Sequence, residues 1–179
     1  MNDPKSIIIS HYSKGKLYEV IIEAIKNAGI DLNNLKVEDL KSVDEFHIGG
    51  IQATLDLLDQ LKIKPKTKIL DIGSGIGGLV RLISTHYEAN VTGIDITPEF
   101  VETAIKINDL LGLNIKFQIG NALNIPFDKN EYDLVTLLHV GMNIPDKNKL
   151  FSEVSRVLNK RGSFAIYDVM IVAEGDFKF

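Results

Sequence analysis

Apolar residues at helical spacing mark the first part of the chain. They recur every three or four positions across residues 16–28, and Gly29 follows as a helix stop. A turn-rich stretch leads to a second predicted helix, which begins near the Gly49-Gly50 pair and ends before Pro65. Its inward-facing positions are Ile51, Leu55, Leu58 and Leu61. Residues 1–65 are therefore predicted to form a helical arm.

After Pro65 the pattern changes to short apolar runs that alternate with helical segments. The predicted strands are residues 68–72, 91–94, 115–119, 132–138 and 163–169. The predicted helices are residues 79–87, 97–111 and 149–158, the first with Leu79, Leu82 and Ile83 on one face. This order is typical of parallel crossover units. We therefore expect residues 66–179 to form an α/β fold with an open, mostly parallel sheet of five strands and helices on both faces.

Composition narrows the class of protein. The chain has 179 residues, 45% hydrophobic and 25% charged, which is typical of one globular domain. It contains no cysteine, which excludes disulfides, thiolate nucleophiles and cysteine-ligated metals, and no metal site is predicted. The net charge of −4 speaks against a nucleic-acid partner. Because the N-terminus lacks a signal layout and no apolar run approaches the ~20 residues of a membrane span, we expect a cytoplasmic protein with no membrane partner.

The strongest chemical signal directly follows the first predicted strand. Residues 71–78 read Asp-Ile-Gly-Ser-Gly-Ile-Gly-Gly, and in open parallel sheets ligands bind at the carboxyl ends of the strands. Glycines there permit a tight turn and the close approach of a ligand. Gly73, Gly75 and Gly78 satisfy the G-x-G-x-x-G pattern. The turn by itself therefore leaves open whether an adenosyl or a nicotinamide cofactor binds.

The end of the second predicted strand carries a carboxylate. Asp95 lies 20 residues after Gly75, where it can accept hydrogen bonds from both hydroxyls of a ribose. Capping of the next helix is the alternative role. That helix is predicted to begin at Thr97-Pro98-Glu99, with the Thr97 hydroxyl as its cap.

The end of the third predicted strand carries an amide. Asn121 can hydrogen-bond an adenine amino group, while Ile96 and Leu123 can sandwich the ring. The alternative is a turn residue whose side chain bonds to its own backbone.

Several segments together resemble the class I S-adenosylmethionine-dependent methyltransferase superfamily. They are, in order, KILDIGSGIGG, VTGIDIT, GNALNIPF and EYDLVTLLHVGMNIPDKNKLFSEVSRVLNKRGSF. The segments DEFHIGGIQATLDLL and HVGMNIPDK resemble more narrowly the sarcosine and dimethylglycine N-methyltransferases, and more loosely the phosphoethanolamine methyltransferases. Within the first of these, Phe46 and His47 either contact the cofactor or pack.

The resemblance implies a Rossmann-like methyltransferase fold with S-adenosylmethionine as cofactor. The implied cofactor-binding residues are Gly73, Ser74, Gly75, Asp95, Ile96, Asn121, Ala122 and His139. The glycine turn would cradle the methionine part and ribose, and Asn121 would stand where aspartate is common. His139 would face the methionine or sulfonium side of the cofactor; a core histidine at a strand end is the alternative.

The implied activity is direct in-line transfer of a methyl group to a small amine such as sarcosine or dimethylglycine. Transfer from a sulfonium needs alignment and exclusion of water more than acid–base catalysis, so no catalytic residue is assigned. The alternatives are a nicotinamide-dinucleotide-binding oxidoreductase fold and a cofactor-binding fragment without turnover.

The end of the chain carries a further expectation. The resembled fold has seven strands, and this chain ends soon after its fifth, so the last two family strands are expected to be missing. The apolar strand around Phe164-Ala165-Ile166 would then be an unpaired edge, which is a pairing hazard. We expect a shortened chain, or an edge covered by its own tail or by a second copy in a homodimer.

Overall fold

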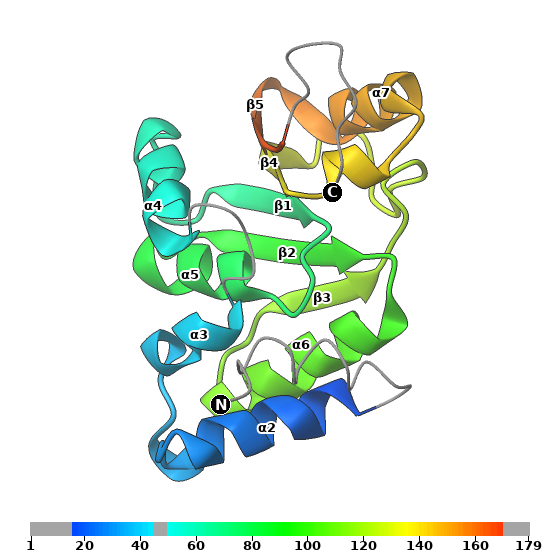
Figure 1. Cartoon of the computed structure of the whole chain (residues 1–179). Helices are drawn as coiled ribbons and strands as arrows, with labels where there is room; N and C mark the ends of the chain where they lie inside the picture. Colours follow the sequence, from blue (N-terminus) through cyan, green and yellow to red (C-terminus); the bar gives the residue numbers. More distant parts are fainter. Residues whose placement is uncertain (1–15, 45–49, 170–179) are drawn as a thin grey trace.

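The computed structural model describes residues 16–44 and 50–169 (Figure 1). The arm consists of α2 (Leu17–Asn27), the 3-10 helices η1 (Leu32–Asn34) and η2 (Val37–Leu40), α3 (Lys41–Asp44) and α4 (Gly50–Gln60). Then follow β1 (Lys68–Ile72), α5 (Gly78–His86), β2 (Asn90–Asp95), α6 (Pro98–Leu111), β3 (Lys116–Ile119), β4 (Tyr132–Leu138), the 3-10 helix η3 (Gly141–Asn143), α7 (Lys147–Val157) and β5 (Leu158–Tyr167). None of the helices in these ranges is long and apolar enough to cross a membrane.

The five strands form one parallel sheet in the order β3-β2-β1-β4-β5. The chain builds outward from β1 to β3 and then returns to the other side of β1 to add β4 and β5. The strand order therefore reverses between β1 and β4, and the crevice at their carboxyl ends is where such sheets bind ligands. The predicted α/β fold with a five-stranded parallel sheet is confirmed.

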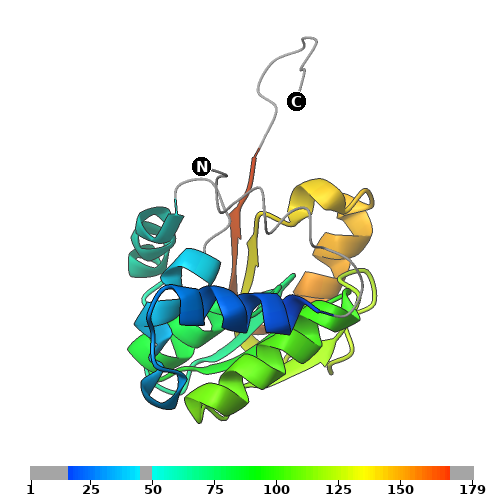
Figure 2. The ribbon, with the colours of Figure 1, turned by 60° about the horizontal axis from the view of Figure 1, so that its bottom comes forward.

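Helices cover both faces of the sheet, as predicted (Figures 1 and 2). On one face, α4, α5 and α6 contribute Leu58, Val80, Ile83 and Ala104 to a core cluster with the sheet. On the other face, Leu150, Val154 and Val157 of α7 pack against a second cluster. Because both faces of β1 and β4 are largely buried, most residues of these strands are apolar, which explains why their bounds can be recognised in the sequence.

The arm packs on the sheet-bearing part through a third cluster. It joins Ile21 and Ile25 of α2 with Leu40, Val43 and Ile107, the last from α6. Figure 2 shows α2 lying along α6, in agreement with the contacts between the two helices. The arm is thereby fixed beside the carboxyl ends of β1 and β2.

The apolar face of α5 coincides only in part with its buried face. Ile83 is buried together with Val80 and Arg81, whereas Leu79 and Leu82 are only partly covered and line a cavity. The arm supplies the reason: α3 contacts α5, and Arg81 finds its ionic partner there, so the helix turns a charged residue inward.

Candidate functional site

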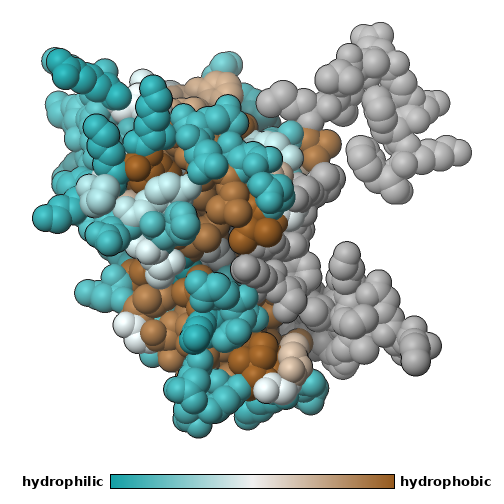
Figure 3. Space-filling model, turned by 90° about the vertical axis from the view of Figure 1, so that its left-hand side faces the viewer, coloured by the Kyte–Doolittle hydropathy of each residue, from teal (hydrophilic) through white to brown (hydrophobic). Residues whose placement is uncertain are grey.

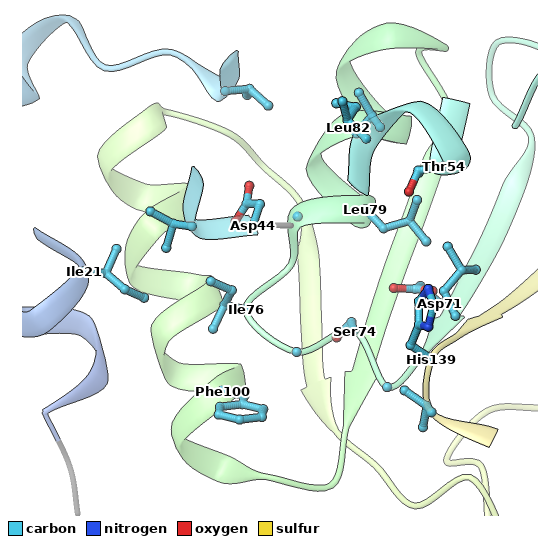
Figure 4. A pocket seen from close by; sticks show the side chains of 18 of the residues that line it. Ile21, Asp44, Thr54, Asp71, Ser74, Ile76, Leu79, Leu82, Phe100 and His139 are labelled. Atoms are coloured by element: carbon cyan, nitrogen blue, oxygen red, sulfur yellow. The ribbon is translucent and has the colours of Figure 1, made fainter. Parts of the chain in front are cut away.

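A cavity of about 450 Å³ lies where the arm meets the glycine turn after β1. The turn contributes Gly73, Ser74, Gly75 and Ile76, and the segment after β4 contributes His139 and Val140. The arm contributes Leu17, Val20, Ile21, Ala24, Val43, Asp44, Ile51 and Thr54. Figure 4 shows Asp71, Ser74 and His139 on one wall of this cavity, with Ile21, Ile76 and Phe100 farther along. Its volume is in the range of small-molecule and cofactor sites.

The glycine turn needs glycine for two separate reasons. Gly73 has φ +75°, and a Cβ there would overlap Val140 Cγ2, so a side chain is excluded by the protein itself. Gly75 has φ +53°, but a Cβ there would meet no atom within 4 Å. The side of Gly75 that a side chain would occupy is therefore open space, which suits the close approach of a ligand.

Asp95 ties the end of β2 to the glycine turn. Its Oδ2 accepts a hydrogen bond from Gly75 N at 2.9 Å, and its Oδ1 accepts one from Thr97 N at 2.8 Å. The residue is buried, with 8% exposure. The capping alternative is thus present in the structure. A carboxylate has about four lone-pair positions, so these two bonds leave acceptor capacity, and the role of Asp95 toward a ribose stays a prediction.

The predicted Thr97 cap is wrong. Thr97 is the N-cap residue of α6, but its hydroxyl makes no capping hydrogen bond. The neighbouring carboxylate of Asp95 bonds to the backbone N–H of Thr97 instead, and charged acceptors make the stronger bond.

The three residues predicted at the adenine end lie apart from the described cavity lining. Ile96 is 66% exposed just beyond β2. Asn121 is exposed and its Oδ1 accepts a hydrogen bond from Leu123 N at 2.8 Å, so the local-turn alternative is what the structure shows. Ala122 packs partly against the core cluster on the α7 face. Their contact with adenine stays a prediction.

His139 lines the cavity immediately after β4. Its backbone has φ +56°, and its N–H donates to Tyr167 O at 2.8 Å. The imidazole meets the Tyr167 ring edge-on, with centroids 5.0 Å apart. The left-handed backbone, uncommon for a residue other than glycine, is held by the end of β5 and directs the ring to this wall.

Asp71 belongs to the site but was not identified from the sequence. It is buried at the end of β1, lines the cavity, and accepts a hydrogen bond from Thr136 Oγ1 at 2.7 Å. Burial raises the pKa of its carboxyl to about 7; the hydrogen bond from Thr136 opposes that shift, and the charge of Asp95 adds to it. Its position two residues before Gly73 was the available signal, but Asp71 lies inside an otherwise apolar run that predicts a strand.

A buried ion pair, which was likewise not identified from the sequence, joins the arm to the glycine turn. The Arg81 side chain is fully buried, and its Nη2 lies 2.5 Å from Asp44 Oδ1. Its Nη1 donates to Ile76 O at 2.8 Å. Asp44 in turn lies so close to Gly78 that a Cβ there would be 2.6 Å from Asp44 Cβ. One guanidinium therefore holds both the arm and the glycine turn in place.

This combination of a parallel sheet, a glycine turn after β1 and a cavity beside it agrees with the comparison to known families. A model described as a methyltransferase domain matches residues 63–177. The chain therefore belongs to the methyltransferase domain family. Its fold is that of the class I S-adenosylmethionine-dependent methyltransferases, as the sequence resemblance implied.

Individual relatives differ in what they methylate. The 24-methylenesterol C-methyltransferase 3 of Arabidopsis thaliana is 36% identical over 113 residues, which are 62% of this chain and 32% of the relative. A protein of Galdieria sulphuraria assigned as a sarcosine dimethylglycine methyltransferase has a TM-score of 0.66 at 27% identity, covering 84% of this chain and 59% of that one. Phosphoethanolamine N-methyltransferase 2 of Haemonchus contortus, in complex with phosphomonomethylethanolamine and S-adenosylhomocysteine, has a TM-score of 0.62 at 27% identity, covering 66% and 28%.

These comparisons decide the cofactor class. The cofactor of this family is S-adenosylmethionine, which confirms the prediction over the nicotinamide alternative. The chain spans between 31% and 46% of the length of the first curated relatives it matches. Phe46 and His47 lie outside the described residues.

Proposed function

We propose that this chain binds S-adenosylmethionine against the glycine turn and transfers its methyl group to a small amine such as sarcosine or dimethylglycine. The observation that supports it most is the open face of Gly75 beside the cavity, within a methyltransferase domain. Bound cofactor supplies an activated methyl group on a sulfonium. The task left to the protein is to hold the two reactants in line and to keep water out.

The residues present fit such a cofactor. Gly73, Ser74 and Gly75 would form the cradle, and Asp95, whose Oδ2 accepts a hydrogen bond from Gly75 N, would accept the ribose hydroxyls. Ile96, 66% exposed, offers the kind of uncovered apolar surface that an adenine ring covers. The carboxyl of Asp71, when ionised, would balance positive charge at the methionine end.

An apolar cavity wall favours an amine acceptor. Only the neutral form of an amine has the lone pair that attacks the methyl group. Ile21, Val43 and Leu79 line the cavity, and burial among such groups lowers the pKa of an amine. Figure 3 shows apolar side chains on the side of the molecule formed by α4 and α5, between hydrophilic ones. The two structural relatives that act on amines support the same class of acceptor.

A matched pair of glycine variants tests the cofactor position. Gly75→Ala and Gly112→Ala place a Cβ at φ +53° and +66°, each with nothing within 4 Å, so their strain should be similar, about 1 kcal/mol. Only the first Cβ enters the proposed cradle. By titration calorimetry we expect Gly75→Ala to weaken S-adenosylhomocysteine binding at least tenfold, and Gly112→Ala to leave it unchanged. Equal affinities in the two variants would refute the position.

The acceptor is tested separately by transfer of a labelled methyl group. Sarcosine, dimethylglycine, phosphoethanolamine and 24-methylenesterol are supplied in turn to the chain with labelled S-adenosylmethionine. We expect product with one of the first two. Product with neither sarcosine nor dimethylglycine would refute these acceptors, and cofactor binding without transfer to any of the four compounds would favour a cofactor-binding fragment without turnover.

A further inference from the structure

Side chains of α7 bind the loop between β3 and β4. It carries Asn121 and Ala122, the predicted adenine contacts, and continues through Ile125, Pro126 and Phe127. Such a loop has few regular backbone hydrogen bonds of its own, so its shape depends on what else binds its N–H and C=O groups.

Glu153 and Arg156 of α7 supply those partners. Glu153 Oε2 accepts a hydrogen bond from Ile125 N at 2.8 Å. Arg156 Nη2 donates to Ile125 O at 2.8 Å, and its Nη1 donates to Phe127 O at 2.7 Å. Three backbone groups on either side of Pro126 are thereby fixed by one helix. We call this pair of side chains the α7 clamp.

The α7 clamp is itself rigid. Arg156 Nε donates to Glu153 Oε1 at 2.9 Å and Nη2 donates to Oε2 at 2.7 Å, a two-pronged arrangement that fixes the plane of both groups. The Glu153 side chain is 8% exposed. The hydrogen bond from Arg156 holds the pKa of Glu153 at about 2, so the carboxylate stays ionised throughout the physiological range.

The other end of the loop is fixed by short-range contacts. Asn121 Oδ1 accepts from Leu123 N at 2.8 Å, and Asn124 N donates to Asn121 O at 2.9 Å. A Cβ on Gly120 would lie 3.3 Å from Pro126 Cδ, so the loop folds back on its own start. Displacing the clamped segment would therefore move Asn121 and Ala122.

We propose that Glu153 and Arg156 are positioning residues that hold the loop of Asn121 and Ala122 in the shape that selects adenine over other purines. This proposal rests on the proposed function, because it takes the adenine of S-adenosylmethionine to lie at that loop. Glu153 and Arg156 are not among the residues that line the described cavity. Its effect is expected on base selectivity more than on binding of the methionine end.

The test compares two ligands that differ only at the purine. S-adenosylhomocysteine and S-inosylhomocysteine, in which oxygen replaces the 6-amino group, are titrated into the full chain and its variants. Arg156→Met removes two charged bonds to the loop, and we expect the preference for the adenosyl ligand to fall about tenfold. Arg156→Lys keeps the charge without the fork and should lie between. Arg161→Met removes an exposed arginine of β5 and should keep the full preference.

The possible results of the titrations distinguish failure of the α7 clamp from failure of the proposed function. A folded Arg156→Met variant with an unchanged adenosyl-to-inosyl ratio would overturn the clamp, even if both affinities fall. Should Arg156→Met not fold, Glu153→Gln provides the same test, because it weakens the bond to Ile125 N and keeps the side-chain shape. A wild-type chain that binds both ligands equally also overturns the clamp, whereas one that binds neither refutes the proposed function.

Discussion

Replacing Asp95 by asparagine should destabilise the protein even without cofactor. The amide can accept from only one of Gly75 N and Thr97 N, and its NH2 group then faces the other N–H. A hydrogen bond to a charged group contributes about 1.5–3 kcal/mol, so Asp95→Asn should lower the free energy of unfolding by about 2 kcal/mol. Loss of the Asp95 charge eases the ionisation of Asp71, but that compensation is small because burial is the main cause of the Asp71 shift.

Urea unfolding followed by circular dichroism measures this effect. In thermal unfolding of a chain of this size, a loss of 2 kcal/mol lowers the Tm by about 4–8 °C. Asp109→Asn, an exposed carboxylate on α6, is the control and should stay within about 0.5 kcal/mol of the wild type. If Asp95→Asn unfolds at the same urea concentration as the control, Asp95 does not hold the glycine turn, and the account of this site is wrong.

Two other buried acids give further predictions. Burial raises the pKa of Asp71 from 3.8 to about 7, so the folded state keeps a proton that the unfolded chain releases. Stability should therefore fall as pH rises from about 4 to 7 and then level off, and Asp71→Asn should flatten that part of the curve of unfolding free energy against pH. Asp44→Ala leaves the Arg81 guanidinium buried and unpaired, which should cost about 3–5 kcal/mol in urea unfolding. The double variant with Arg81→Met should cost less than the sum of the single variants; strict additivity would contradict the ion pair.

Strand positions were predictable where a buried strand meets a clear boundary. The predicted ranges 68–72 and 132–138 agree with β1 and β4 because glycine, lysine or a charged turn bounds each apolar run. The fifth strand, predicted from residue 163, begins at Leu158, directly after α7. Leu158 of β5 pairs with Tyr132 of β4. Such pairing between distant residues cannot be recognised from the local sequence pattern.

The site could be predicted only in part, again because contacts between distant residues do not appear in the local sequence pattern. Gly73, Ser74, Gly75 and His139 do line one cavity, since strand ends at the switch point converge by topology. The burial of Arg81 could not be predicted, because an arginine in an amphipathic helix normally faces solvent and its partner Asp44 lies 37 residues away. Helix spacing shows which face is apolar but not which charged residue another element will bury.

Ile107 limits how this domain can be recombined with its relatives. It lies on α6, yet it shares an apolar cluster with Ile21, Ile25 and Leu40 of the arm. A chimera that exchanges everything before Lys66 must bring a matching apolar surface for Ile107 and an acid for Arg81. An arm that lacks either feature would uncover Ile107 and leave the Arg81 guanidinium without its carboxylate, so an exchange of the arm requires matching changes in α5 and α6.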